Sequence, residues 1–394
     1  MNGFNLQRIR QARSMEAAII PAVLCCLTVR LPSCAAVPQN GDPTARKPAA
    51  ACAQQLPLYL LDATGAYAGK TSVPQAHYAE GLKLYAAGDQ AGAEREFRAA
   101  VAGEPSHPDY VHRLASLYIT EARYEAAAAL VRDYTKLCGP TALGYGLEGE
   151  LLFQQRDYDA ALTAVTSSLG LSANSARMHE LLGLILFTKR QNVGSRSELE
   201  KAEQLEPDNA EIRYFYGRSL YLTGLYAEAR EQFLACVRID PSYRKCRENL
   251  GLCYQALRDY AKAAEAFKEA IALEKAQSGP KHGEPFGYYG AMLAETGQSL
   301  QALPILREGE KLCPRSLVVN YELGRILLGD GDLDQAERYL LVAENLDPTF
   351  AQTYYLLGKV HQRQGRADQA ALDWNRFQEL HKDPANREFP LTDR

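Results

Sequence analysis

A glycine-rich segment is the first place where this sequence suggests chemistry. Residues 144–149, Gly-Tyr-Gly-Leu-Glu-Gly, have the spacing of the loop that binds the pyrophosphate of a dinucleotide. That loop binds phosphate only where it joins a β-strand to a helix, because the helix N-terminus supplies the free backbone amides. No strand pattern precedes Gly144. The sequence therefore indicates a coincidence of spacing, and we expect no cofactor.

Cysteine and histidine side chains are candidates for metal, nucleophile or disulfide chemistry. The nine cysteines form none of the closely spaced pairs of zinc sites, and the seven histidines are scattered, so no metal site is predicted. No nucleophile has a base at a recognisable spacing, and we expect no catalytic residue and no enzyme. In an oxidising compartment Cys236 could pair with Cys246 or Cys253, although buried free thiols are the favoured interpretation.

Three tyrosines are each followed, four residues later, by a basic residue. Side chains at this separation lie on one face of a helix. An aromatic ring beside a cation suits the carbonyl and carboxylate groups of an extended peptide, although such a pair also occurs on ordinary solvated faces. The recurrence favours a binding surface. The pairs are Tyr214 with Arg218, Tyr321 with Arg325, and Tyr355 with Lys359.

The N-terminus has the pattern of a secretory signal peptide, which we place at residues 1–36. Arginines come before a short apolar run at 17–29, and small residues at 33–36 follow it. The run would rise only about 20 Å as a helix, so no membrane span is expected in the mature chain. An organelle transit peptide, or a true start at Met15, is the alternative. Cleavage before Cys34 would leave a lipid anchor, which is the less favoured outcome.

The segment after the signal and the overall charge restrict the function further. Residues 37–73 are rich in Ala, Pro, Gly, Gln and Thr, and we expect a mostly disordered linker. The net charge of −4 leaves no basic excess to neutralise a phosphate backbone. We therefore expect no nucleic-acid partner.

From about residue 74 onwards the sequence repeats itself every 34 residues, with one step of 39. A small residue marks each unit, a second follows twelve positions later, and a bulky apolar residue comes four positions after that. Small residues let two helices approach closely, and the bulky residue fills the seam between them. Each unit is thus predicted to be an antiparallel pair of helices. The first small residues are Gly81, Ala115, Gly149, Gly183, Gly217, Gly251, Gly290, Gly324 and Gly358.

This pattern resembles the tetratricopeptide repeat family, whose 34-residue unit has small, aromatic and proline positions at these offsets. The resemblance covers residues 74–384, followed by a tail at 385–394. It implies an all-α fold, a right-handed α-solenoid (superhelix) of helix-turn-helix hairpins. The nine repeats start near residues 74, 108, 142, 176, 210, 244, 283, 317 and 351.

Two units depart from the family pattern. The unit at 142–175 has Gly144 and Gly146 in its first helix, and the unit at 176–209 has Gly194 and Ser195 where alanine is expected. Because an interior glycine costs about 1 kcal/mol relative to alanine, we expect both units to be locally weaker. A hinge in this region is one consequence.

The family's concave face is lined by the first helix of each hairpin, so the resemblance implies that a partner binds there. The family's lysine-and-asparagine clamp for terminal carboxylates is absent. Glu180 and Glu248 also project onto this face. The candidate peptide-binding residues are Tyr78, Tyr85, His112, Tyr214, Arg218, Tyr221, Tyr321, Arg325, Tyr355, Lys359 and Arg363.

These features together predict a non-catalytic scaffold or adaptor of the cell envelope. We expect it to be exported to the periplasm or the extracellular space and to bind a protein or an extended peptide on the concave surface. One alternative is a structural solenoid that associates with copies of itself and has no separate ligand. Another is a cytosolic adaptor whose N-terminus is misassigned.

Overall fold

The computed structural model describes residues 72–278 and 280–383. The predicted signal peptide, the predicted tail and all but the last two residues of the predicted linker lie outside this range. The described residues form 18 helices and no strand, which confirms the all-α fold and the count of nine helical hairpins.

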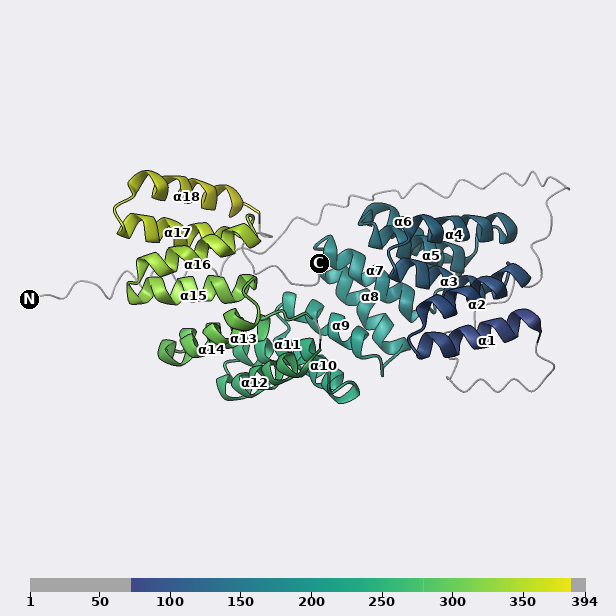
Figure 1. The fold of residues 1–394 in the computed structure, drawn as a ribbon, viewed down its shortest axis with the longest axis horizontal. Coiled ribbons are helices and arrows are strands. Elements are labelled where there is room, and N and C mark those ends of the chain that lie inside the picture. The colour runs from purple at the N-terminus through teal and green to yellow at the C-terminus, as the bar shows by residue number, and fades with distance from the viewer. Residues whose placement is uncertain (1–71, 279, 384–394) are drawn as a thin grey trace, which may run out of the picture. The chain divides into compact units, whose positions relative to one another are not determined.

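The helices follow one another along the chain as consecutive pairs (Figure 1). Odd-numbered helices are the first helices of the hairpins and even-numbered helices are the second. Their bounds are α1 (Val73–Ala86), α2 (Gln90–Gly103), α3 (Pro108–Thr120), α4 (Tyr124–Cys138), α5 (Ala142–Gln154), α6 (Tyr158–Leu171), α7 (Ala176–Thr188), α8 (Asn192–Leu205), α9 (Ala210–Leu222), α10 (Tyr226–Ile239), α11 (Arg244–Ala256), α12 (Tyr260–Ala276), α13 (Glu284–Glu295), α14 (Ser299–Leu312), α15 (Leu317–Asp330), α16 (Leu333–Leu346), α17 (Ala351–Arg363) and α18 (Ala367–Leu380).

The seam inside each hairpin has the composition that the repeat pattern predicts. A Cβ atom added to Gly217 of α9 would lie 2.8 Å from ring carbons of Phe233 in α10, which is closer than two carbon atoms can approach. The same glycine position in the other hairpins faces the bulky residue sixteen positions later. Where alanine replaces glycine, at Ala115, the corresponding residue of that buried cluster is the smaller Val131. The helices are therefore as close as these side chains allow.

The turn between the two helices of each hairpin also has a fixed geometry. One residue there adopts a positive φ, which ends a helix by turning the chain into the left-handed region. Glycine provides it in five hairpins, as at Gly224 (φ 78°), but Arg258 (φ 62°) occupies the same place in α11–α12. Side chains in this region raise the backbone energy. The four turns without glycine are closed by backbone hydrogen bonds, such as the one from Asp259 N to Tyr254 O at 2.9 Å. The residues with positive φ in these turns are Ala122, Arg156, Arg190 and Arg258.

Consecutive hairpins pack through both of their helices. Each second helix contacts the first helix of the next hairpin, as α10 contacts α11, and first helices also contact one another from α3 through α17. The five extra residues of the sixth interval lengthen α12 and the link that precedes α13. Each hairpin thus packs against its neighbours in the chain.

The glycine motif at 144–149 lies inside α5. The residues before it belong to α4 and a short link, so the strand that a dinucleotide-binding loop needs is absent there. Gly149 is the seam glycine, and its added Cβ would lie 2.5 Å from Val165 Cγ2. At Gly146 the added Cβ would be 3.1 Å from Met178 Sδ in the next hairpin. These glycines therefore serve close packing.

Ser195 occupies the second small position of its hairpin and is fully buried. Its hydroxyl oxygen has no hydrogen-bond partner. Because a buried hydroxyl without a partner loses its hydration and gains nothing in return, this site disfavours the folded state. The weakness of the 176–209 unit, predicted from its interior glycine, stays a prediction, and this hydroxyl is a second reason to expect it.

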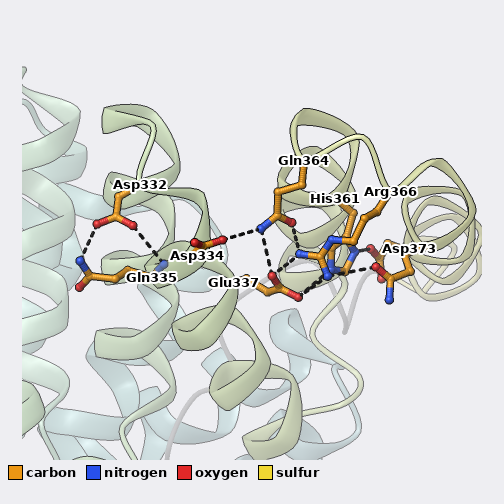
Figure 2. A network of polar contacts seen from close by, with 9 residues as sticks. Asp332, Asp334, Gln335, Glu337, His361, Gln364, Arg366 and Asp373 are labelled. Atoms are coloured by element: carbon orange, nitrogen blue, oxygen red, sulfur yellow. Dashed lines mark hydrogen bonds and ion pairs between the residues drawn. The ribbon is translucent and has the colours of Figure 1, made fainter.

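A polar network ties the last hairpin to the one before it (Figure 2). Glu337 of α16 accepts hydrogen bonds from Arg366, from Gln364 Nε2 at 3.1 Å and from His361 Nε2 at 3.2 Å. The second ring nitrogen of His361, Nδ1, lies 2.6 Å from Asp373 Oδ2 of α18. His361 therefore connects α16 to α18 through its two ring nitrogens.

The charges around Glu337 affect its protonation. Hydrogen bonds, chiefly from Arg366, hold the pKa of Glu337 at about 2, below its ordinary value of 4.5. Its ionised form is therefore favoured in the folded state. This contribution to stability is present above pH 4.5 and is lost as the pH falls through about 2.

We expect Gly217→Ala to lower the free energy of unfolding by about 1–3 kcal/mol, because the added methyl group forces Phe233 out of the seam. Gly170→Ala is the matched control. It also lies in a helix, α6, but an added Cβ has open space around it, so the substitution should stabilise by about 0.5–1 kcal/mol. Urea denaturation followed by circular dichroism measures both, and equal effects would contradict the seam.

We expect Glu337→Gln to destabilise the chain by about 1–2 kcal/mol at pH 7, because solvent partly screens the ion pairs that it breaks. The difference from wild type should shrink as the pH falls from 5 towards 2. Asp334→Asn is the control, since Asp334 accepts only one hydrogen bond of the network, from Gln364 at 3.2 Å. Denaturation midpoints measured across this pH range test the assignment, and a pH-independent difference would refute it.

Candidate partner-binding face

The predicted binding residues all lie on first helices, but their exposure differs. We call the surface of these helices that bears them the first-helix face. Tyr78, Tyr214 and Arg218 are buried, at 9%, 3% and 3% exposure. Tyr85 and Arg363 are exposed, and the remaining six are half-buried, namely His112, Tyr221, Tyr321, Arg325, Tyr355 and Lys359.

The pair on α9 is packed inside the protein. Arg218 Nη1 donates to Tyr214 Oη at 3.3 Å, and its guanidinium lies 5.0 Å from the ring centre of Phe187 in α7. Burial raises the pKa of Tyr214, so the phenol stays neutral. This pair connects two hairpins, and its guanidinium is held between aromatic rings.

The two pairs near the C-terminal end have different surroundings. Arg325 of α15 donates from Nε to Glu322 Oε2 at 2.7 Å, and burial raises the pKa of that carboxyl group. On α17, Lys359 Nζ lies 4.2 Å from the ring centre of Tyr355, which packs edge-on against Trp374 at 5.5 Å. The arrangement of cation over ring that the spacing predicted is therefore closest at Tyr355 and Lys359.

The predicted residues of the first two hairpins are close to the core. Tyr78 contacts Tyr110, with ring centres 4.8 Å apart, and Arg113 lies 6.0 Å from the ring centre of Tyr85. Burial lowers the pKa of His112 and so favours its neutral form. His112 lines a small pocket together with Gly146 and Met178.

Two further residues form contacts that their spacing did not predict. Tyr221 packs against Tyr226 at the start of α10, with ring centres 5.1 Å apart. Arg363 donates from Nη1 to the backbone oxygen of Leu328 at 2.5 Å, which joins α17 to α15. Both side chains thus contribute to packing between neighbouring helices. Their role in binding stays a prediction.

Sequence reasoning missed two arginines that bridge carboxylates on this face. Arg177 of α7 contacts Glu150 of α5 and Glu180 of its own helix. Arg244 of α11 contacts Glu248, and its Nε lies 2.7 Å from Glu274 Oε2 in α12. The three-residue spacing of Arg177 and Glu180 could have predicted their ion pair. The contact of Arg177 with Glu150 spans 27 positions and had no such signal in the sequence.

Cysteine chemistry in the structure corrects the sequence interpretation. Cys236 of α10 and Cys246 of α11 form a disulfide bond, with Cα atoms 6.2 Å apart, so the preference for free thiols at these two positions was wrong. Cys253 is free and buried, and burial raises the pKa of its thiol to about 12. The bridge joins two hairpins because a second helix packs on the next first helix.

Residues 72–278 and 280–383 contain no group of three His, Cys, Asp or Glu side chains that could hold a metal ion. Within the same residues, no helix has both the length and the apolar character that crossing a membrane requires.

Comparisons with known proteins concern the repeats. A solved tetratricopeptide repeat protein from Parabacteroides merdae is 14% identical, with a TM-score of 0.48 over 73% of this chain and 98% of its own. Another, YrrB, described as having an unusual peptide-binding site, is 20% identical, with a TM-score of 0.33 over 48% of this chain and 94% of its own. No curated protein matches the sequence.

Family comparison covers more than half of the chain. One family profile described as tetratricopeptide repeat matches residues 78–140, 147–204, 194–244 and 321–379. A second profile with the same description matches residues 245–277. The chain therefore belongs to the tetratricopeptide repeat family.

Proposed function

We propose that this protein is a non-catalytic adaptor of the cell envelope that binds an extended segment of a protein partner on its first-helix face. The observation that carries the proposal is a repeated pair. Tyr321 and Arg325 on α15 recur 34 residues later as Tyr355 and Lys359 on α17. All four side chains are half-buried, and the two helices are in contact.

This repetition suits a ligand that is itself repetitive. An extended peptide presents carbonyl groups at regular intervals, which cations and tyrosine hydroxyls can bind. The rings of Tyr321 and Tyr355 are braced by Phe350 and Trp374, at 5.2 and 5.5 Å between ring centres. Because braced side chains lose little conformational freedom on binding, they suit a contact surface.

Two observations support export, which is part of the proposal. The N-terminus has the pattern of a signal peptide, and the chain contains the Cys236–Cys246 disulfide. Structural disulfides persist in oxidising compartments and are rare in the cytosol, where thiols are kept reduced.

We expect Arg325→Glu with Lys359→Glu to weaken peptide binding at least about tenfold, since reversed charges repel the carbonyl and carboxylate groups of the ligand. The probe is a library of N-acetylated, C-amidated dodecapeptides, with the affinities of the selected peptides measured by fluorescence anisotropy. Arg307→Glu is the control, because Arg307 is exposed and belongs to a second helix, α14.

Two outcomes of this experiment would contradict the proposal. If the purified protein selects no peptide, or if the double variant binds as wild type does, the first-helix face is not the binding surface. Light scattering coupled to size-exclusion chromatography adds a second readout, since a stable closed oligomer would favour the self-associating alternative.

For export, mass spectrometry of the native protein should find an N-terminus close to residue 36. Alkylation of the denatured but unreduced protein should leave Cys236 and Cys246 unmodified, and reduction should lower the free energy of unfolding by about 3 kcal/mol. Cys253 should react only after denaturation, because it is buried. An intact Met1, or a start at Met15, would rule out the export claim.

A further inference from the structure

Around Arg177, in the middle of the first-helix face, buried carboxylates outnumber basic groups. Arg177 Nε donates to Glu150 Oε1 at 2.9 Å, and its Nη1 donates to Glu180 Oε2 at 3.0 Å. The side chains of Glu150 and Glu180 are only 10% and 4% exposed. One guanidinium thus serves two buried carboxylates, so this cluster has an uncompensated negative charge when both are ionised.

Glu180 has a polar atom that the protein leaves unsatisfied. Its second carboxylate oxygen, Oε1, is buried and has no hydrogen-bond partner. Burying a carboxylate oxygen without a hydrogen-bond donor costs free energy, and buried polar atoms normally have a hydrogen-bond partner. The missing group is therefore a hydrogen-bond donor, and a positive charge on it would also balance the cluster.

We propose that Glu180, together with Glu150 and Glu211, forms an acidic subsite that takes a lysine or arginine side chain of the bound peptide. The inference rests on the proposed function, because it assumes that a peptide lies on the first-helix face. Glu211 of α9 is exposed and the Arg177 side chain is 39% exposed, so the cluster borders solvent. A long basic side chain can bury its methylene stem while its charged end reaches a carboxylate.

The charges around Glu180 make this subsite sensitive to pH. Burial raises its pKa to about 7, Arg177 opposes that shift, and the carboxylates of Glu211 and Glu206 add to it. Glu150 faces it from α5 through Arg177, and Tyr243 lies close enough to be affected by its charge. On α7 itself, His179 pairs with Glu198 of α8 at 2.7 Å, and Lys189 pairs with Asp159 of α6.

The test is a positional-scanning library of N-acetylated, C-amidated octapeptides without histidine. Wild type should prefer lysine or arginine over norleucine at one position by about tenfold. Glu180→Gln should remove that preference while retaining selection at other positions. Glu211→Gln, at an exposed residue where folding is not at risk, should reduce the preference. Glu200→Gln, exposed on α8, is the matched control and should leave it unchanged.

A second measurement follows from the protonation of Glu180. For a peptide with the selected cation, wild-type affinity should be about tenfold weaker at pH 6 than at pH 8, because roughly nine-tenths of Glu180 is protonated at pH 6. Glu180→Gln should bind with no such dependence.

If wild type binds peptides without preferring a cation, or if both variants keep the preference, the acidic subsite is wrong and the proposed function stands. If wild type binds no peptide, both are overturned.

Discussion

The contact between a glycine or alanine and a bulky side chain inside each hairpin is the constraint on which this structure depends. At Gly217 and Phe233 the two helices approach until no further atom fits between them. Because packing forces decay steeply with distance, a wider seam would lose contacts along its whole length. A hairpin held this way still has apolar faces left over, and it buries them against its neighbours, which is why the fold extends by repetition.

The seam uses only part of each helix, and the rest of the surface varies between hairpins. On the first-helix face, Arg177 and Arg244 connect carboxylates within and between hairpins. Buried charges of this kind contribute little net stability, since desolvation offsets their attraction. Under the proposed function they present polar groups on a rigid support, among them the Oε1 atom of Glu180, which has no hydrogen-bond partner.

Equivalent repeat positions do not produce equivalent sites. Tyr214 and Arg218 occupy the same offsets as Tyr355 and Lys359, yet the first pair is enclosed and the second lies half-buried at the face. The difference comes from neighbours, because Phe187 of the preceding hairpin covers Arg218 whereas Trp374 only braces the ring of Tyr355. The surroundings of each pair are therefore a property of adjacent hairpins taken together.

The sequence by itself determined the helices, their pairing and the residues of the seam, because these follow from a spacing that repeats within each unit. It did not predict that each turn has a residue with positive φ, because arginine, which occupies this place at Arg258, has no preference for the left-handed region. Only the tertiary structure decided that Cys236 pairs with Cys246 and not with Cys253, and that Arg177 contacts Glu150. Those contacts join different hairpins, and their geometry depends on how the helices pack against one another, which no single repeat encodes.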